Sequence, residues 1–301
     1  MSERKKERLC NMNQILANGI VAGSAYALIA IGFSLIYSTV RFFHFAHGAV
    51  YTVAAYVGWV LHVSGLPFIF CIIISCLIAS LLGSGIYLGV YAPLQMKRSP
   101  QLIFLLASFA LFVFFSGLLQ LIFGGDIQAY KGFVVKEGHN IAGALVTNHQ
   151  LVIIATTLVV TFILSVWLSR TNLGRAIRAV ADDPLAASLM GVNSRQVVSV
   201  VFAIGSGLAG LAGVLISFET NLYPAMGFDA ILKGIVAALI GGLGNIYGAL
   251  LGGLVLGLAE NFGVMGISAG WKDTVAFLIL VLFLLVRPRG MAGGEKSQRE
   301  V

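Results

Sequence analysis

Long stretches without a charged residue constrain the fold of this chain more than any other feature. No Asp, Glu, Lys or Arg occurs at 42–96, 99–125 or 138–169. A helix needs about 20 predominantly apolar residues to cross the hydrocarbon core of a bilayer. Charged residues make up 10% of the chain, whereas a soluble domain carries roughly 25%. The sequence therefore predicts an all-α, polytopic membrane protein.

Eight hydrophobic segments are expected to form the membrane helices. Neither of the two longest polar connections, 124–149 and 170–196, is large enough to be a domain. Residues 1–301 are therefore predicted to form a single transmembrane domain. The eight segments are 14–37, 45–64, 67–92, 101–123, 150–168, 197–217, 231–258 and 271–286.

The basic residues predict how these segments are oriented, because short cytoplasmic loops carry an excess of Lys and Arg. Simple alternation through eight spans cannot place all of the basic clusters in the cytoplasm. The conflict disappears if segments 45–64 and 231–258 are broken or re-entrant. Both termini and loop 170–196 are then cytoplasmic, while loop 124–149 and Glu219 are external. The clusters are Arg4-Lys5-Lys6-Arg8, Lys97-Arg98, the arginines from Arg170 to Arg195, and Arg287 with Arg289.

The two exceptional segments also carry the polar residues that could line a translocation path. His44 directly precedes the first, His47 lies at its start, and Asn245 lies in the glycine-rich run of the second. Broken helices are tolerated at membrane depth where they are buried in protein or line a cavity. The segments are second from each end of the chain, which favours two inverted repeats with a site between them.

Glu260 is a fourth path candidate, because an intramembrane carboxylate is expensive. Each candidate also has a purely structural interpretation. The histidines can be buried packing residues, Asn245 can bond to freed backbone groups, and Glu260 can lie at the membrane interface.

The polar block 170–196 predicts a short helix on a loop. Asp182 and Asp183 precede Pro184, a pattern typical of a helix N-cap followed by proline in the first turn. The helix is expected to end at Gly191, since glycine is favoured just after a helix C-terminus. Its small residues, including Ala187, suit a groove on a partner protein.

Arg175 and Arg178 precede this helix, and two interpretations of them stay open. They contact a partner protein, or they anchor a helix end in anionic lipid.

No constellation of catalytic residues is present. The sequence has no Gly-x-Ser-x-Gly, His-Glu-x-x-His or Walker A motif. We therefore expect no enzymatic activity, no cofactor and no metal site. The net charge of +7 comes from short loops and termini, so nucleic acid is not an expected partner, whereas membrane lipid is.

Four stretches carry a resemblance to a known family, in the same order along nearly the whole chain. They are FAHGAVYTVAAY at 45–56, GRAIRAVADDPLAASLMGVN at 174–193, IGGLGNIYGALLGGLVLG at 240–257 and LLVRPRG at 284–290. The chain resembles permease subunits of ABC importers of the branched-chain amino acid (LivH/LivM) type. It departs from them at His44, where the family usually has Asn, and at Ala49, where Glu is common. The second departure puts an ammonium-binding role for that position in doubt.

The resemblance implies a mechanism and partners. Two permeases form a pore, the second being a non-identical chain, in a prokaryotic inner membrane. Two cytoplasmic ATPase subunits dock on loop 170–196, and an extracytoplasmic binding protein delivers the solute. The coupling residues would be Arg175, Arg178, Asp182, Asp183, Pro184, Ala187 and Gly191.

The expected solutes are branched-chain or other hydrophobic amino acids. An importer of urea, short amides or another small polar solute is the alternative within the family. An autonomous secondary transporter is the alternative from another class. It would need buried ionisable residues for ion coupling, and the long charge-free spans argue against it.

Overall fold

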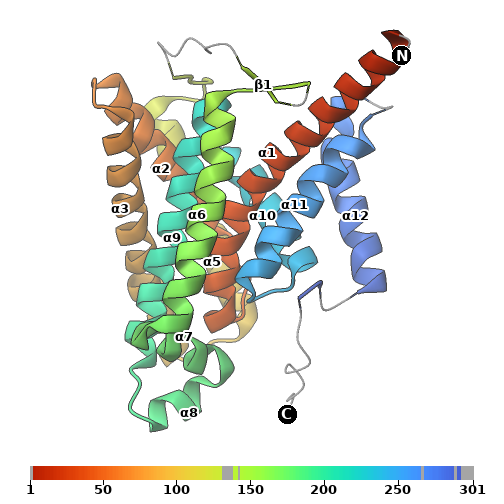
Figure 1. The fold of residues 1–301 in the computed structure, drawn as a ribbon. Coiled ribbons are helices and arrows are strands. Elements are labelled where there is room, and N and C mark those ends of the chain that lie inside the picture. The colour runs from red at the N-terminus through yellow and green to blue at the C-terminus, as the bar shows by residue number, and fades with distance from the viewer. Residues whose placement is uncertain (1–2, 131–137, 142, 266–267, 288–289, 293–301) are drawn as a thin grey trace.

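The computed structural model describes residues 3–130, 138–141, 143–265, 268–287 and 290–292 (Figure 1). The helices form a bundle. A short β-hairpin lies at one end, which is called the hairpin end. α7 and α8 lie at the other, which is called the α7–α8 end. The elements are α1 (Glu3–Val40), α2 (Ala46–Val63), α3 (Phe68–Ile86), the π-helix η1 (Tyr87–Tyr91), α4 (Ala92–Met96), α5 (Gln101–Phe123), β1 (His139–Ile141), β2 (Ala144–Val146), α6 (Asn148–Arg170), α7 (Asn172–Asp182), α8 (Pro184–Leu189), α9 (Ser194–Glu219), α10 (Met226–Gly241), α11 (Ile246–Gly263), the 3-10 helix η2 (Ala269–Trp271) and α12 (Lys272–Val286).

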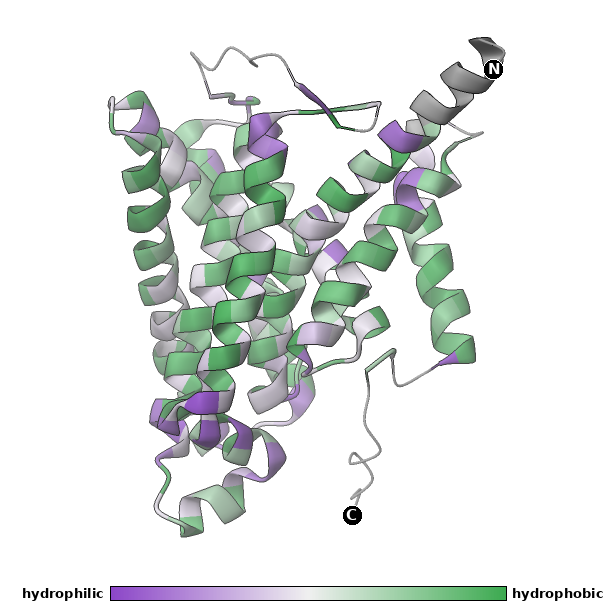
Figure 2. Ribbon diagram, in the orientation of Figure 1, coloured by the Kyte–Doolittle hydropathy of each residue, from purple (hydrophilic) through white to green (hydrophobic). Residues whose placement is uncertain are grey.

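Apolar residues make up the bodies of the helices, and polar residues gather around α7 (Figure 2). α1 and α9 are largely buried at the centre, whereas α3, α5 and α6 keep most of their surface exposed. Such exposed apolar faces suit contact with lipid. The prediction of an all-α membrane protein is confirmed. The described helices that are long and apolar enough to span a membrane are Met12–Val40, Phe68–Met96, Gln101–Phe123, Asn148–Arg170, Ser194–Glu219 and Ile246–Gly263.

α1 and α11 cross with their backbones in close contact. A Cβ atom on Gly253 would lie 2.7 Å from the backbone nitrogen of Ala27, and one on Gly23 would lie 2.7 Å from Cα of Leu254. Small residues at four-residue intervals allow this approach, which is a common basis of helix association in membranes. The glycine-rich composition of α11 is therefore a packing feature along most of its length.

Segment 231–258 is broken, as predicted. α10 and α11 are separated by a turn in which Gly242 and Gly244 have φ values of 103° and 85°. Glycine populates this region at little cost. Asn245 then caps α11 by accepting the N–H of Gly248 at 3.0 Å.

The C-terminal segment of the chain covers the end of α10. The N–H of Met291 donates to the carbonyl of Ile240 at 2.9 Å, and the N–H of Ala292 donates to that of Gly241 at 3.0 Å. A helix end leaves carbonyl groups without partners inside the helix, and inside a membrane these need protein partners. Residues 291–292 supply two of them.

Segment 45–64 forms one continuous helix, so the predicted break there is wrong. α2 has 18 residues, which makes it about 27 Å long at 1.5 Å per residue. Near its far end, Trp59 Nε1 donates to the carbonyl of Ala129 at 3.3 Å, on the connection that leads to the hairpin. The irregular backbone lies before the helix, at Arg41, whose φ is 53°. Residues 41–45 therefore form the turn between α1 and α2.

α1 connects opposite ends of the bundle (Figure 1). Near its start, Gln14 exchanges two hydrogen bonds with the backbone of Leu145 in β2, at 3.1 and 2.8 Å. Just after its end, Arg41 donates to the carbonyl of Ala181 in α7 at 2.9 Å. The N-terminal end of α1 therefore lies at the hairpin end. The prediction that it shares a side with loop 170–196 is wrong.

The reason is that α1, α2 and α3 each run the length of the bundle. Three crossings then separate the start of α1 from Lys97. The basic-residue rule describes a bias that the first helix does not always dominate, and α2 is a continuous helix that adds a crossing. The side chains of the basic cluster at 4–8 lie outside the described residues.

Segment 231–258 gives two helices, so the described residues hold nine helices of 15 residues or more rather than eight. The inverted-repeat arrangement stays a prediction.

Candidate functional site

α7 is an amphipathic helix held against the end of α6. Its apolar face is buried, and Arg175 and Arg178 are exposed. Arg178 donates to the carbonyl of Leu168 in the last turn of α6, and Arg175 donates to Oδ1 of Asn172. A guanidinium at a helix C-terminus satisfies a free carbonyl and complements the helix dipole. Arg178 therefore anchors α7 to the end of α6. Part of the guanidinium group of each arginine is left for contact with an outside partner.

α8 begins and ends as the sequence predicts. Oδ1 of Asp183 accepts the N–H groups of Leu185 and Ala186 at 2.8 and 3.0 Å, and Pro184 occupies the first turn. Gly191 follows the helix with a φ of 84°. The predicted cap, proline and terminator are confirmed as local structure. Asp182 ends α7 and is exposed.

The exposed surface of α8 is apolar, and this was not apparent in the sequence interpretation. Leu185, Leu189 and Met190 are 71%, 81% and 85% exposed. Ala187 is 5% exposed and packs into the core, so its predicted contact with a partner is wrong. Ala187 instead fixes α8 to the bundle. The signal for the apolar face is the spacing of Leu185 and Leu189, which places both on one side of a helix.

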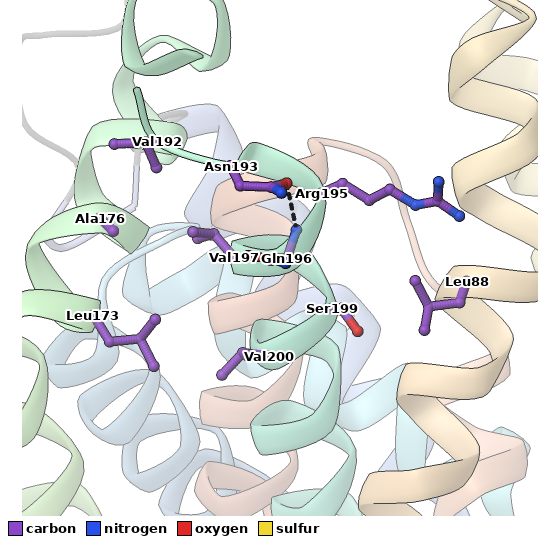
Figure 3. A pocket seen from close by; sticks show the side chains of 10 residues that line it. All are labelled: Leu88, Leu173, Ala176, Val192, Asn193, Arg195, Gln196, Val197, Ser199 and Val200. Atoms are coloured by element: carbon purple, nitrogen blue, oxygen red, sulfur yellow. Dashed lines mark hydrogen bonds between the residues drawn. The ribbon is translucent and has the colours of Figure 1, made fainter. Parts of the chain in front are cut away.

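A cavity of about 820 Å³ lies between the start of α9, α7 and the π-helix η1. Figure 3 shows Arg195 extending from α9 toward Leu88 of η1, with Leu173 and Val200 on the far wall. The lining is mainly apolar, and Asn193 caps α9 by accepting the N–H of Gln196 at 3.2 Å. The start of α9 is therefore not packed tightly against η1.

η1 places a tyrosine beside His44. Pro93 lacks an N–H and its ring would clash with the carbonyl of Gly89 in a regular α-helix, and the wider π turn lies at this point. The hydroxyl of Tyr91 lies 3.0 Å from Nδ1 of His44. His44 is fully buried and also meets Phe202 of α9 edge-on, with ring centroids 5.1 Å apart.

His47 is fully buried as well. It lies against α1, where a Cβ atom on Gly32 would be 3.2 Å from the imidazole ring. The two histidine ring centroids are 6.1 Å apart. The structure brings His44 and His47 together, but inside an aromatic cluster and away from the cavity next to α9. Their packing role is evident, and a transport role stays a prediction.

Asn245 is likewise accounted for by local structure. In addition to capping α11, its side-chain amide donates to the carbonyl of Ala292 at 3.5 Å. It therefore holds the turn between α10 and α11 against the C-terminal segment.

Glu260 belongs to a charged network that joins four helices. Its Oε2 accepts the hydroxyl proton of Tyr26 in α1 at 2.7 Å, and its Oε1 lies 3.5 Å from Nζ of Lys233 in α10. Lys233 Nζ also lies 3.0 Å from Oδ1 of Asp273 in α12 and 3.2 Å from the hydroxyl of Tyr26. The sequence interpretation missed Lys233. Its signal is a single lysine in an otherwise apolar stretch, since such residues are rare within membranes and face protein or water.

Glu219 lies at the hairpin end, opposite α7 and α8, and its external position stays a prediction. Its Oε1 accepts a 2.5 Å hydrogen bond from Gln150, which links the end of α9 to the start of α6. Nearby, the hydroxyl of Tyr130 donates to the carbonyl of Ala55 at 3.4 Å. A tyrosine is already a neutral donor at physiological pH, and burial raises the pKa of Tyr130 further, to about 12.

Comparison with known proteins decides the family. The profile of a family described as "Branched-chain amino acid transport system / permease component" matches residues 15–284. The chain belongs to this family. It is 36% identical over 301 residues to the high-affinity branched-chain amino acid transport system permease protein BraD of Pseudomonas aeruginosa, covering 95% of this chain and 97% of BraD. It is 36% identical over 307 residues to LivH of Escherichia coli, with the same shares covered.

The resemblance extends to an archaeal relative. The chain is 25% identical over 297 residues to a probable branched-chain amino acid transport permease protein LivH of Methanocaldococcus jannaschii, covering 93% of this chain and 92% of the relative. No solved structure matches the chain. The chain is a multi-pass membrane permease.

Proposed function

We propose that this chain is the permease subunit of an ABC importer for branched-chain or other hydrophobic amino acids in a prokaryotic inner membrane. The observation that carries the proposal is the 36% identity to BraD and LivH over 95% of the chain. ATP hydrolysis is assigned to separate ATPase subunits, because the sequence has no Walker A motif.

In the proposed orientation the α7–α8 end faces the cytoplasm and the hairpin end faces outward. The exposed arginines Arg175, Arg178 and Arg195 support it, since basic residues are enriched in cytoplasmic loops. The hairpin end, with Glu219, then meets the solute-binding protein. Residues 1–301 act as one domain, with loop 170–196 as its coupling element and loop 124–149 as its external element.

α8 is the proposed contact with the ATPase. Leu185, Leu189 and Met190 form an apolar surface at the tip of the polar loop, beyond the bundle (Figure 1). Helices with such a face bind in hydrophobic grooves of partner proteins. Each of two permeases, this chain and a non-identical second one, presents such a helix to one ATPase.

Movement of α8 would pass to α9, the central helix of the bundle. The hydroxyl of Ser194 at the start of α9 donates to the carbonyl of Pro184 at 3.3 Å, and the N–H of Val192 donates to that of Ala187 at 3.0 Å. The cavity next to Leu88 leaves space for the start of α9 to shift. Closure of the ATPases would then switch the bundle between two packed states.

The test is to purify the chain from its host in mild detergent and to measure uptake in proteoliposomes supplied with the solute-binding protein. Co-purification with ATPases and ATP-dependent uptake of leucine or valine, rather than urea, is the expected result. A chain that purifies alone and transports without ATP contradicts the proposal.

A variant tests the coupling element separately. Gly191→Arg is expected to leave membrane insertion and ATP hydrolysis intact and to abolish uptake, because arginine strains a backbone at φ 84° and disturbs the end of α8. Normal uptake by this variant would contradict the role assigned to α8.

A further inference from the structure

A group of charged side chains lies where α10 meets the start of α12, with Lys233 at the middle of α10, Asp229 in its first turn and Asp273 in the first turn of α12. Lys233 is the eighth of the 16 residues of α10, which places it roughly 10 Å along the axis from the start. Its side chain is 20% exposed, and that of its ion-pair partner Asp273 is 66% exposed. Asp229 lies one turn before Lys233 and is also exposed. Opposite charges thus lie one helical turn apart, where side chains are neighbours.

This surface is unsuited to contact with lipid. Charged side chains within membrane helices are costly, and they face protein or a water-filled cavity. The exposed surfaces of α5 and α6, by contrast, are formed by leucine, isoleucine, valine and phenylalanine, as at Leu121 and Phe162. The face of α10 and α12 that carries these charges therefore meets water, a polar ligand or another protein chain rather than lipid.

The ammonium group of Lys233 is held but not enclosed. It lies 3.5 Å from Glu260, 3.0 Å from Asp273 and 3.2 Å from the hydroxyl of Tyr26. Glu260 is completely buried behind it, and Asp273 approaches it from the exposed side. Exchanging Asp273 for a carboxylate of a ligand would leave the contact of Lys233 with Glu260 intact.

The second exposed carboxylate is positioned separately. Oδ2 of Asp229 accepts a hydrogen bond of 2.8 Å from the hydroxyl of Tyr223. This contact leaves Oδ1 of Asp229 and the released carboxylate of Asp273 as acceptors for a cationic group. The cluster therefore offers a cation and two anions within reach of one small molecule.

We propose that Asp229, Lys233 and Asp273 form a binding site on the translocation pathway that recognises both charged ends of a zwitterionic amino acid. Lys233 takes the α-carboxylate, and Asp229 with Asp273 takes the α-ammonium group. This inference rests on the proposed function and adds to it where the solute is recognised within the membrane. It also places the α10–α12 face toward the pore.

Accessibility to a water-soluble thiol reagent tests the placement. Asp229 and Asp273 are each changed to cysteine in a chain whose three cysteines are replaced by alanine, and the complete transporter is treated with 2-sulfonatoethyl methanethiosulfonate in proteoliposomes. We expect both cysteines to react, and leucine with ATP to slow the reaction severalfold. Phe162→Cys in α6, which is 69% exposed on an apolar surface, is the matched control and is expected not to react.

Two outcomes overturn the placement. If Asp229→Cys and Asp273→Cys are as unreactive as Phe162→Cys, the face is covered by lipid or by the second permease. If they react at a rate that leucine and ATP leave unchanged, the face is accessible to water but is not on the translocation pathway.

Substrate analogues test the recognition. Lys233→Gln is expected to raise the KM for leucine at least about tenfold and to reduce the preference for leucine over leucinamide, which lacks the carboxylate. Asp273→Asn is expected to raise the KM without that change in preference. A purely structural ion pair would instead lower the amount of assembled transporter and leave the KM and the preference of the remainder unchanged.

Failure of this inference can be told from failure of the proposed function. If the unaltered transporter takes up leucine with ATP while both variants keep its KM and its preference, the proposed binding site is contradicted. The proposed importer function is not contradicted by that result. If the unaltered transporter does not take up leucine at all, the proposed function itself is contradicted.

Discussion

The guanidinium group of Arg41 donates a 2.9 Å hydrogen bond to the carbonyl of Ala181, and this contact joins the end of α1 to the end of α7. Arg41 has a φ of 53°, a value uncommon for a residue other than glycine. α1 is the most buried of the candidate spans. The contact therefore links the polar loop to the centre of the bundle, independently of the covalent connection through α9.

Removing this link is expected to weaken coupling more than stability. For Arg41→Met we expect a loss of about 1 kcal/mol or less in stability, because the hydrogen bond is exposed, and a severalfold drop in leucine uptake per ATP hydrolysed. The ratio of uptake to hydrolysis in proteoliposomes measures this effect. Arg98→Met is the matched control, since Arg98 is exposed at a similar φ of 51°. An equal drop in both variants argues against a specific role for Arg41.

The apolar face of α8 gives a second prediction. Leu189→Asp places a charge where an apolar groove of the ATPase is expected to bind, so ATPase recovered with the purified permease is expected to fall at least about tenfold, corresponding to about 1.4 kcal/mol. Val63→Asp adds the same charge at the exposed last residue of α2, at the hairpin end, and is expected to leave recovery unchanged. Equal recovery in the two variants would place the ATPase contact elsewhere.

Asn245 gives a third prediction, which separates its capping role from a transport role. Loss of the N-cap in Asn245→Ala is expected to reduce stability by about 0.5–2 kcal/mol, as measured by thermal unfolding of the purified complex. Asn245→Ser keeps a capping oxygen and should restore most of the stability and the uptake. Uptake that stays low in a stable serine variant would instead support a direct role in the path.

Features with local causes were predictable from the sequence. The charge-free segments admit few folds besides membrane helices, and Asp183, Pro184 and Gly191 set the ends of α8 through their own backbone chemistry. The turn at Gly242 and Gly244 was predictable for the same reason. Each of these depends on residues close together in the chain.

Features that depend on helix pairing were not predictable. The neighbours of Lys233 come from α1, α11 and α12, which no local pattern brings together. The continuity of α2 depends on its burial among other helices, and the break predicted there from the placement of the basic clusters was therefore wrong. Ala187 was assigned to a partner because small residues serve equally well at an interface and in a core.

The crossing of α1 and α11 gives the final prediction. In Gly253→Ala the new methyl group would lie 2.7 Å from the backbone nitrogen of Ala27, so the helices must separate. Overpacking of this kind typically costs about 1–3 kcal/mol, which over most of that range is more than the helix propensity gained on replacing glycine by alanine, about 1 kcal/mol. Gly117→Ala in α5 is the control, because its Cβ would meet no atom within 4 Å. Thermal unfolding is expected to show a loss in the first variant and no loss in the second. A first variant as stable as the second would mean that α1 and α11 do not cross through their glycines.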